Sequence, residues 1–212
     1  MIIGIVGKAR SGKDTFAELL AEEIFNISRK RFVLMAYAQE LKLRIQRDFD
    51  LSYDQLWGDQ KEVEDRRYKK KHVNNMIAGR RDKSEIESEY WTPREIMQFI
   101  GTECFRSVDN NFWVKTLFRT ISEKEYKNVI ITDVRFPEEA NAVLDHDGYL
   151  IKVTREEKDS IHGEAHASET SMDDYDKFDF VINNDGDIED LRKAAQDTIK
   201  LLSKLSKTKK ED

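Results

Sequence analysis

The sequence predicts an α/β fold: a mainly parallel, five-stranded sheet with helices on both faces. Three observations support this prediction. Short apolar runs alternate along the chain with longer segments in which apolar residues recur at helical spacing. A glycine-bounded loop separates the first apolar run from the first helical segment. The length of 212 residues suits a single domain with an insertion, and it is enough for a sizeable core.

The first strand is expected at residues 2–6, and the loop at residues 7–15 follows it directly. Glycines let the backbone of such a loop curl so that successive N–H groups point at a polyphosphate, and the start of the next helix adds partial positive charge. Lys13 adds a full charge. We therefore predict a three-layer P-loop NTPase fold in which the whole loop binds the nucleotide: Gly7, Lys8, Ala9, Arg10, Ser11, Gly12, Lys13, Asp14 and Thr15.

The loop departs from the usual phosphate-loop pattern at one position. After Lys13 the pattern requires Ser or Thr, whose hydroxyl holds Mg²⁺, but here Asp14 follows and Thr15 comes one residue later. This Lys-x-Thr order resembles the loop of adenylate-kinase-type nucleoside monophosphate kinases. A carboxylate beside phosphates is expected to serve a metal or a substrate proton, so Asp14 joins Lys13 as a candidate catalytic residue.

The remaining strands are expected in four apolar runs, at residues 31–37, 129–133, 149–153 and 178–182. Apolar residues recur at helical spacing in the stretches between these runs and after the last run, which predicts helices there. Strands that alternate with helices favour a parallel sheet, and ligands bind such sheets beyond the carboxyl ends of the strands. The loop at residues 7–15, Asp133, Arg135 and Arg155 all fall at that edge.

The charged residues at this edge suit phosphoryl transfer. An arginine fork binds phosphate oxygens in a bidentate manner, so Arg135 is expected to neutralise the transferring group. Arg155 follows the next strand and is a further candidate for binding substrate. Asp133 has two interpretations that the sequence leaves open: it holds Mg²⁺ together with Thr15, or it caps the next helix, which Pro137 opens.

A capped helix is expected to begin after Thr92, with Pro93 in its first position and Glu95 in its third. Helical spacing predicts a buried stripe on this helix: Ile96, Phe99, Ile100 and Cys104.

A second face of the same helix carries polar side chains at spacings of four residues. Arg94, Gln98 and Thr102 lie on it, and Arg106 follows one turn later. We expect Arg94, Gln98 and Arg106 to bind the acceptor of the phosphoryl group.

Two segments lack this regularity. Residues 58–90 are charge-dense, with a basic run at 66–71, and we expect a solvated helical or mobile excursion; the alternative is a basic arm that contacts nucleotide phosphates. Residues 156–177 are polar and aperiodic, which suits a lid-like loop that closes over the phosphates. His162 and His166 lie four residues apart in it, but Gly163 between them and the lack of a cysteine partner argue against zinc.

Composition restricts the function further. The formal net charge of −6 argues against a binder of nucleic acid polymers. Cys104 is the one cysteine, so no disulfide framework exists and a reducing compartment is expected. No apolar run reaches membrane-spanning length, and the first strand leaves no room for a signal peptide, so we expect a cytoplasmic location and no membrane partner. An apolar helix face can serve as core or interface, so the sequence allows a homodimer.

Several segments together resemble the bacteriophage-type deoxynucleoside monophosphate kinases. They follow the family's order at residues 7–15, 92–106, 112–114, 133–139, 166–169 and 179–186. The resemblance implies a helical NMP-binding insertion, ATP as donor, Mg²⁺, and a deoxynucleoside 5′-monophosphate (dNMP) as the small-molecule acceptor, giving dNDP and ADP. It also implies a substrate-binding role for Glu169, and host cytoplasm as the location of a phage-encoded protein.

Two other functions fit the residues. The first is a P-loop kinase for another small phosphorylated acceptor, such as a coenzyme precursor or phosphomevalonate, because the animal-type phosphomevalonate kinase also has a Gly-Lys-Asp loop. The second is a non-catalytic, nucleotide-gated interaction protein that uses residues 58–90 as its partner surface.

Overall fold

The computed structural model describes residues 1–70, 89–156 and 170–208. The chain divides into two compact units. The first comprises Met1–Tyr37 and Trp113–Asp212, and the second comprises Ala38–Phe112. The second unit is a helical insertion between the two parts of the first unit. It is longer than the insertion predicted from charge density, which covered only residues 58–90.

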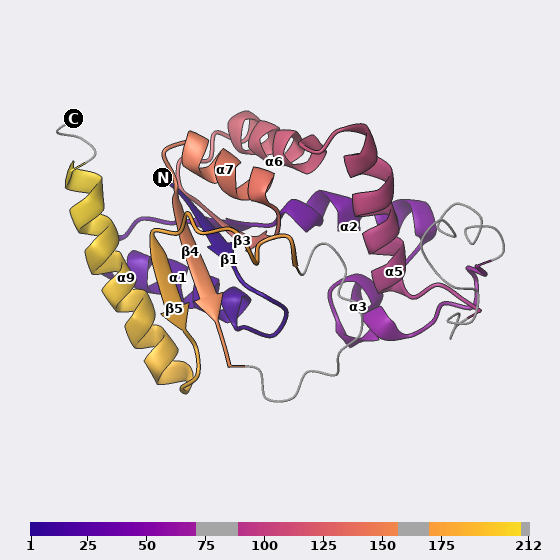
Figure 1. Ribbon diagram of the computed structural model, residues 1–212, viewed down its shortest axis with the longest axis horizontal. Coiled ribbons are helices and arrows are strands. Elements are labelled where there is room, and N and C mark those ends of the chain that lie inside the picture. Colours follow the sequence, from indigo (N-terminus) through magenta and orange to yellow (C-terminus); the bar gives the residue numbers. More distant parts are fainter. Residues whose placement is uncertain (71–88, 157–169, 209–212) are drawn as a thin grey trace. The chain divides into compact units, whose positions relative to one another are not determined.

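The first unit is built on a five-stranded sheet in the order β2-β3-β1-β4-β5 (Figure 1). All its described strand pairings are parallel, which confirms the predicted α/β fold. The strands are β1 (Ile2–Val6), β2 (Val33–Met35), β3 (Val129–Val134), β4 (Tyr149–Thr154) and β5 (Phe180–Asn183). The helices of this unit are α1 (Lys13–Ser28), α6 (Phe112–Glu123), α7 (Pro137–Asp145) and α9 (Ile188–Thr208).

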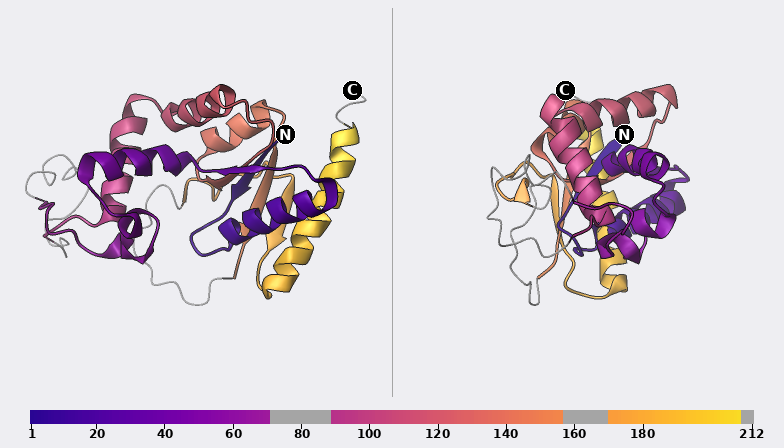
Figure 2. Two further views of the ribbon diagram at one scale, coloured as in Figure 1. Left: turned by 180° about the vertical axis from the view of Figure 1, so that it is seen from behind. Right: turned by 90° about the vertical axis from the view of Figure 1, so that its right-hand side faces the viewer.

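Helices cover both faces of this sheet, as predicted. Ile3 and Ile5 of β1 belong to a buried cluster that includes Phe16 and Leu20 of α1 and Leu191 of α9. The next residue along β1 faces the other way, because a Cβ atom added at Gly4 would lie 3.1 Å from Val143 of α7. In Figures 1 and 2, α1 and α9 lie side by side, and α7 lies on the opposite face.

The sheet contains a bulge beside the loop that follows β1. Gly4 pairs with Ile131 and Val6 pairs with Val134, so β3 holds one extra residue over this interval. The side chain of Val134 consequently turns to the same face as Gly4. The bulge therefore sets the orientation of β3 immediately before Arg135.

The second unit consists of short helices and connecting segments. They are α2 (Tyr37–Phe49), α3 (Tyr53–Leu56), the 3₁₀ turn η1 (Asp59–Glu62), α5 (Pro93–Gln98) and the π-helix η2 (Phe99–Arg106). The predicted start of α5 is confirmed: the Thr92 hydroxyl accepts the Glu95 N–H, and the Glu95 carboxylate accepts the Thr92 N–H.

The predicted buried stripe is wrong beyond Ile96, because Phe99 and Ile100 are only half-buried and Cys104 is exposed. After Gln98 the helix continues with π geometry, in which hydrogen bonds join residues five apart. The buried positions accordingly follow a five-residue spacing through Ile96, Gly101 and Arg106. The same change of period removes Arg106 from the face that carries Arg94 and Gln98.

The described flanks of residues 58–90 are mostly exposed, but part of their backbone is paired. Lys69 and Tyr90 form an antiparallel bridge. Around it the Trp91 N–H donates to the Tyr68 carbonyl and the Lys70 N–H donates to the Glu89 carbonyl, both at 2.9 Å. These segments are therefore paired and packed, while residues 71–88 lie outside the described chain.

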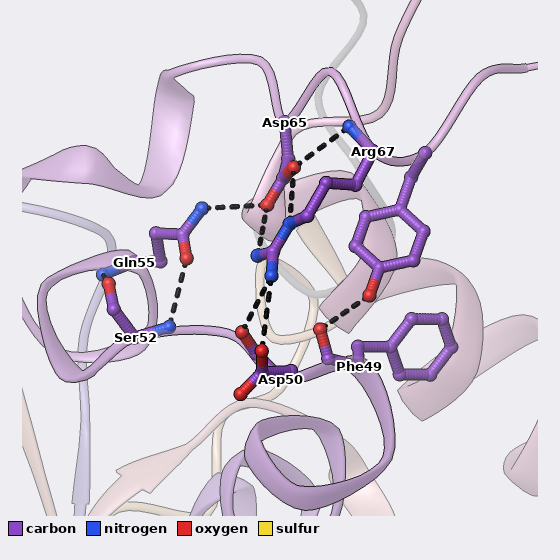
Figure 3. Close-up of polar contacts among 7 residues, drawn as sticks. Phe49, Asp50, Ser52, Gln55, Asp65 and Arg67 are labelled. Carbon is purple, nitrogen blue, oxygen red and sulfur yellow. Dashed lines mark hydrogen bonds and ion pairs between the residues drawn. The ribbon is translucent and has the colours of Figure 1, made fainter.

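A polar network holds this pairing to the rest of the second unit (Figure 3). The Arg67 guanidinium binds both carboxylate oxygens of Asp65, at 2.9 Å from Nε and 2.6 Å from Nη2, and it also donates to the Asp50 carbonyl. The side-chain Nε2 of Gln55 donates to Asp65 at 2.9 Å, and the side-chain Oε1 of Gln55 accepts the Ser52 N–H. The bonds from Arg67, followed by that from Gln55, lower the pKa of the buried Asp65 carboxyl far below its usual range.

Replacement of Asp65 by Asn should destabilise the protein by about 1–3 kcal/mol at pH 7, because charged hydrogen bonds to a buried group are lost. The folded-state pKa of Asp65 is lowered, so its carboxylate stabilises the fold above the unfolded pKa of about 3.9 and loses that effect as the pH falls below it. Urea unfolding at pH 7 and pH 3 should show the difference between wild type and Asp65→Asn shrinking in acid.

The matched control is Asp48→Asn, because Asp48 is an exposed partner of Arg47 in the same unit and should contribute little. An equal effect of the two substitutions, or a difference between wild type and Asp65→Asn that is the same at both pH values, would contradict the assigned role of the network.

Candidate phosphate-binding site

The loop after β1 has the geometry of a phosphate cradle. Gly12 and Arg10 adopt the left-handed conformation, with φ of 86° and 63°, and Gly12 directly precedes α1. A Cβ atom at Gly7 would lie 2.5 Å from Ser11 Oγ and 2.7 Å from the Val153 carbonyl, so glycine is needed for the close approach. The backbone of the loop and the start of α1 therefore surround one position, which suits a bound phosphate.

Two groups in the cradle point to a ligand. Lys13 is buried although it carries a full charge, and its Nζ lies 3.6 Å from Asp14 Oδ2. The Ser11 hydroxyl is buried and, within the part of the chain that the structure describes, has no hydrogen-bond partner. Buried polar groups are normally hydrogen-bonded, so a phosphate oxygen bound in the loop would satisfy this hydroxyl and pair with the lysine.

Asn184 fixes the loop from the far end of the chain, and sequence reasoning missed it. Its buried side-chain Nδ2 donates to the Ser11 carbonyl at 2.8 Å, and its backbone N–H donates to the Thr154 carbonyl at 2.7 Å. The sequence of residues 183–186 is typical of a turn, and nothing in it indicates a contact with Ser11. Because the Ser11 carbonyl is held by Asn184, the N–H of the same peptide group, on Gly12, faces the opposite way.

The predicted residues of the first unit meet at the carboxyl edge of the sheet. Val6, immediately before the loop, pairs with Val134 on one side and Lys152 on the other. Asp133 and Arg135 flank Val134 and therefore lie beside the start of the loop. Arg155 follows the end of β4 and is exposed.

Asp133 does not cap the helix that follows it. Its Oδ1 accepts the Tyr37 N–H at the start of α2 at 2.7 Å, while the buried Glu139 accepts the N–H groups of Arg135 and Phe136 at the start of α7. Tyr37 in turn donates its hydroxyl to the Glu139 carbonyl. Burial, and then the carboxylates of Glu139 and Asp133, raise the pKa of the Tyr37 hydroxyl far above its usual range, so Tyr37 remains a neutral donor.

The remaining candidates fall elsewhere. Arg94, Gln98 and Arg106 belong to the second unit, where Arg94 forms an ion pair with Glu62 and Arg106 is buried. Glu169, His162 and His166 lie outside the described residues.

The described end of the predicted lid is anchored in the first unit. Lys8 Nζ lies 3.1 Å from Asp173, and the Tyr175 hydroxyl donates to Asn141 of α7. This part of the predicted lid therefore contacts the phosphate loop through Asp173 and α7 through Tyr175, and residues 157–169 lie outside the described chain.

The side chains at this edge also suit Mg²⁺. Thr15 and Asp14 are exposed on the first turn of α1, and Asp133 lies at the neighbouring strand. Mg²⁺ is usually held by one or two carboxylates together with substrate phosphates, so these oxygen ligands are sufficient. Among the described residues there is no cluster of three or more His, Cys, Asp or Glu that could hold a metal by itself. No described helix is long and apolar enough to cross a membrane.

This sheet order, with a glycine-bounded cradle between β1 and α1, defines a P-loop α/β protein. The family model described as deoxynucleotide monophosphate kinase matches residues 39–195, and the chain belongs to this family.

Three curated proteins are similar to the chain. A protein of Acanthamoeba polyphaga mimivirus, provisionally named a deoxynucleotide monophosphate kinase, is 29% identical over 90% of this chain and 91% of its own length. The deoxynucleoside-5′-monophosphate kinase of Escherichia phage T5 is 28% identical over 50% of this chain and 45% of its own length. The deoxynucleotide monophosphate kinase of Enterobacteria phage T4 is 30% identical over 53% of this chain and 47% of its own length.

Replacement of Asn184 by Ala should weaken binding of a nucleoside triphosphate about tenfold, because loss of the buried bond to Ser11 releases the loop. Isothermal titration calorimetry would measure the dissociation constant. The neighbouring substitution Asn183→Ala is the control, since Asn183 is exposed and bonds to the Thr154 hydroxyl instead of the loop. Wild-type affinity in Asn184→Ala would exclude the proposed anchoring role.

Proposed function

We propose that this chain transfers the terminal phosphoryl group of ATP to a deoxynucleoside 5′-monophosphate, giving ADP and dNDP, with Mg²⁺ bound. The observation that carries the proposal is the buried Lys13 in a glycine-bounded cradle beside Asp133 and Arg135, in a chain of the deoxynucleotide monophosphate kinase family. Phosphoryl transfer requires mainly alignment and positive charge, and this edge of the sheet supplies both.

Each residue has a distinct proposed role. The backbone N–H groups of residues 7–13 and the Lys13 ammonium bind the donor phosphates. Thr15 and Asp133 hold Mg²⁺, which when bound neutralises charge on the phosphate oxygens. Asp14 orients the acceptor phosphate or the metal. Arg135 stabilises the charge that accumulates on the transferring group.

The acceptor is assigned to the second unit. Arg94, which pairs with Glu62, and Gln98 are half-exposed on α5, and both are proposed to contact the acceptor. Arg106 is buried, so its proposed role is to support the helix from its inner side. Arg155 and Glu169 belong to the first unit and stay proposed as substrate-binding residues.

Replacement of Lys13 by Ala should lower turnover by about two to three orders of magnitude, because the donor phosphates lose their buried countercharge. The measurement is ADP release from ATP and Mg²⁺ with each of the four dNMPs. The matched control is Lys30→Ala, since Lys30 is an exposed lysine just beyond the end of α1. Near-normal turnover in Lys13→Ala would refute the site. ATP binding without turnover on any dNMP would refute the proposal that a dNMP is the acceptor.

Arg135 can be tested separately from the phosphate loop. Arg135→Ala should lower kcat about a hundredfold or more with a smaller change in the KM for ATP, because its charge acts mainly in the transition state. Arg119→Ala is the control, since Arg119 is exposed on α6 and pairs with Glu123. An increase in KM with unchanged kcat would assign Arg135 to substrate binding instead.

A further inference from the structure

Tyr37 bonds at two points to the segment of residues 133–139, which contains Arg135. Its backbone N–H donates to Asp133 Oδ1 at 2.7 Å, and its hydroxyl donates to the Glu139 carbonyl at 3.1 Å. These partners lie 96 and 102 residues away in the chain, and Tyr37 is only 4% exposed. Asp133 begins the segment and Glu139 ends it, so a single buried residue holds both of its ends.

The pairing of β2 with β3 brings Tyr37 to this segment. Met35, the last residue of β2, pairs with Ile131, and the same parallel register continued for two residues places Tyr37 opposite Asp133. The strand has ended at that point, and the Asp133 side chain accepts the Tyr37 N–H. The contact between the two segments therefore continues beyond the sheet, through a carboxylate instead of a carbonyl.

Glu139 connects the Tyr37 hydroxyl to Arg135. The carboxylate of Glu139 is buried, and its Oε2 accepts the Arg135 N–H at 2.9 Å and the Phe136 N–H at 3.2 Å. The carbonyl of the same residue accepts the Tyr37 hydroxyl. Tyr37 thus holds the backbone of Glu139, and the side chain of Glu139 holds the backbone of Arg135.

The Tyr37 hydroxyl has two possible roles, which make different predictions. A buried hydrogen bond adds to stability wherever it lies, and this one does so in either case. A residue that positions Arg135 also affects the reaction, and that effect depends on the presence of the arginine side chain. A merely stabilising bond has no such dependence.

We propose that Tyr37 is a positioning residue for phosphoryl transfer, because it holds both ends of residues 133–139 and so sets the place of Arg135. The proposal rests on the proposed function, which assigns Arg135 to the transferring group. Stabilisation of charge in a transition state requires groups that are already in position, and a misplacement of about 1 Å costs up to about a hundredfold in rate. The hydroxyl of Tyr37 therefore acts on kcat rather than on nucleotide binding.

Replacement of Tyr37 by Phe removes the hydroxyl and keeps the ring and the backbone N–H. It should lower kcat about tenfold and change the KM for ATP and for the dNMP less than about twofold. In an Arg135→Ala background the same substitution should change kcat less than about twofold, because the side chain that it positions is absent. The control is Tyr149→Phe, since Tyr149 is a similarly buried tyrosine at the amino end of β4.

Amide hydrogen exchange tests the same bonds in protein without nucleotide. The Arg135 N–H should exchange about tenfold faster in Tyr37→Phe than in wild type, because Glu139 is held less firmly. The reference is the Val129 N–H at the start of β3, which bonds to the Met1 carbonyl and should not change. Unchanged exchange at Arg135 would overturn the proposal.

Glu139→Gln provides a second variant if Tyr37→Phe does not fold, as judged by circular dichroism. It keeps an acceptor oxygen and removes the charge, so kcat should fall, and this loss should likewise disappear in the Arg135→Ala background. An unchanged kcat in folded Tyr37→Phe, or the same loss of kcat with and without the Arg135 side chain, would overturn the proposal. Absence of turnover in wild type would refute the proposed function instead, a result distinct from either.

Discussion

The register of β1 between β3 and β4 is the constraint on which the proposed chemistry depends. Val6 pairs with both neighbours at the point where the phosphate loop begins. Parallel pairing brings the segments after all three strands to the same edge, so Lys13, Asp133 and Arg135 gather without any local signal that joins them. The bulge in β3 then sets the direction of the side chains at the end of that strand.

This edge is reinforced by bonds between distant parts of the chain. Asn184 holds the phosphate loop through Ser11, and Asp133 holds the start of α2 through Tyr37. In both cases a side chain bonds to a backbone group, which fixes a peptide orientation more directly than packing does. Preorganisation of this kind suits a reaction in which the protein supplies position and charge rather than covalent chemistry.

The second unit is held together by a polar network and by close packing of its helices. The Asp65–Arg67 network joins the end of α2, α3 and the segments beside the undescribed stretch (Figure 3). The π-helix turns Gly101 against Leu41, where a Cβ atom would lie only 2.6 Å from the leucine side chain. The aromatic side chains of the same unit are covered less completely, since Phe49, Tyr68, Trp91 and Phe99 are all half-buried.

The sequence alone determined the parallel α/β fold, the phosphate loop, the cap at Thr92 and the family resemblance, because each depends on residues close together in the chain or on a periodicity that local sterics impose. It did not determine the exposure of Cys104, since a π-helix differs from an α-helix by one residue per hydrogen bond and leaves no distinct pattern. Nor did it indicate the roles of Asn184 and Asp65. Asn184 and Ser11 are 173 residues apart, so only the tertiary structure brings them together. The partners of Asp65 are nearer, since Arg67 and Gln55 lie two and ten residues away, but the path of the connecting segment decides that they meet.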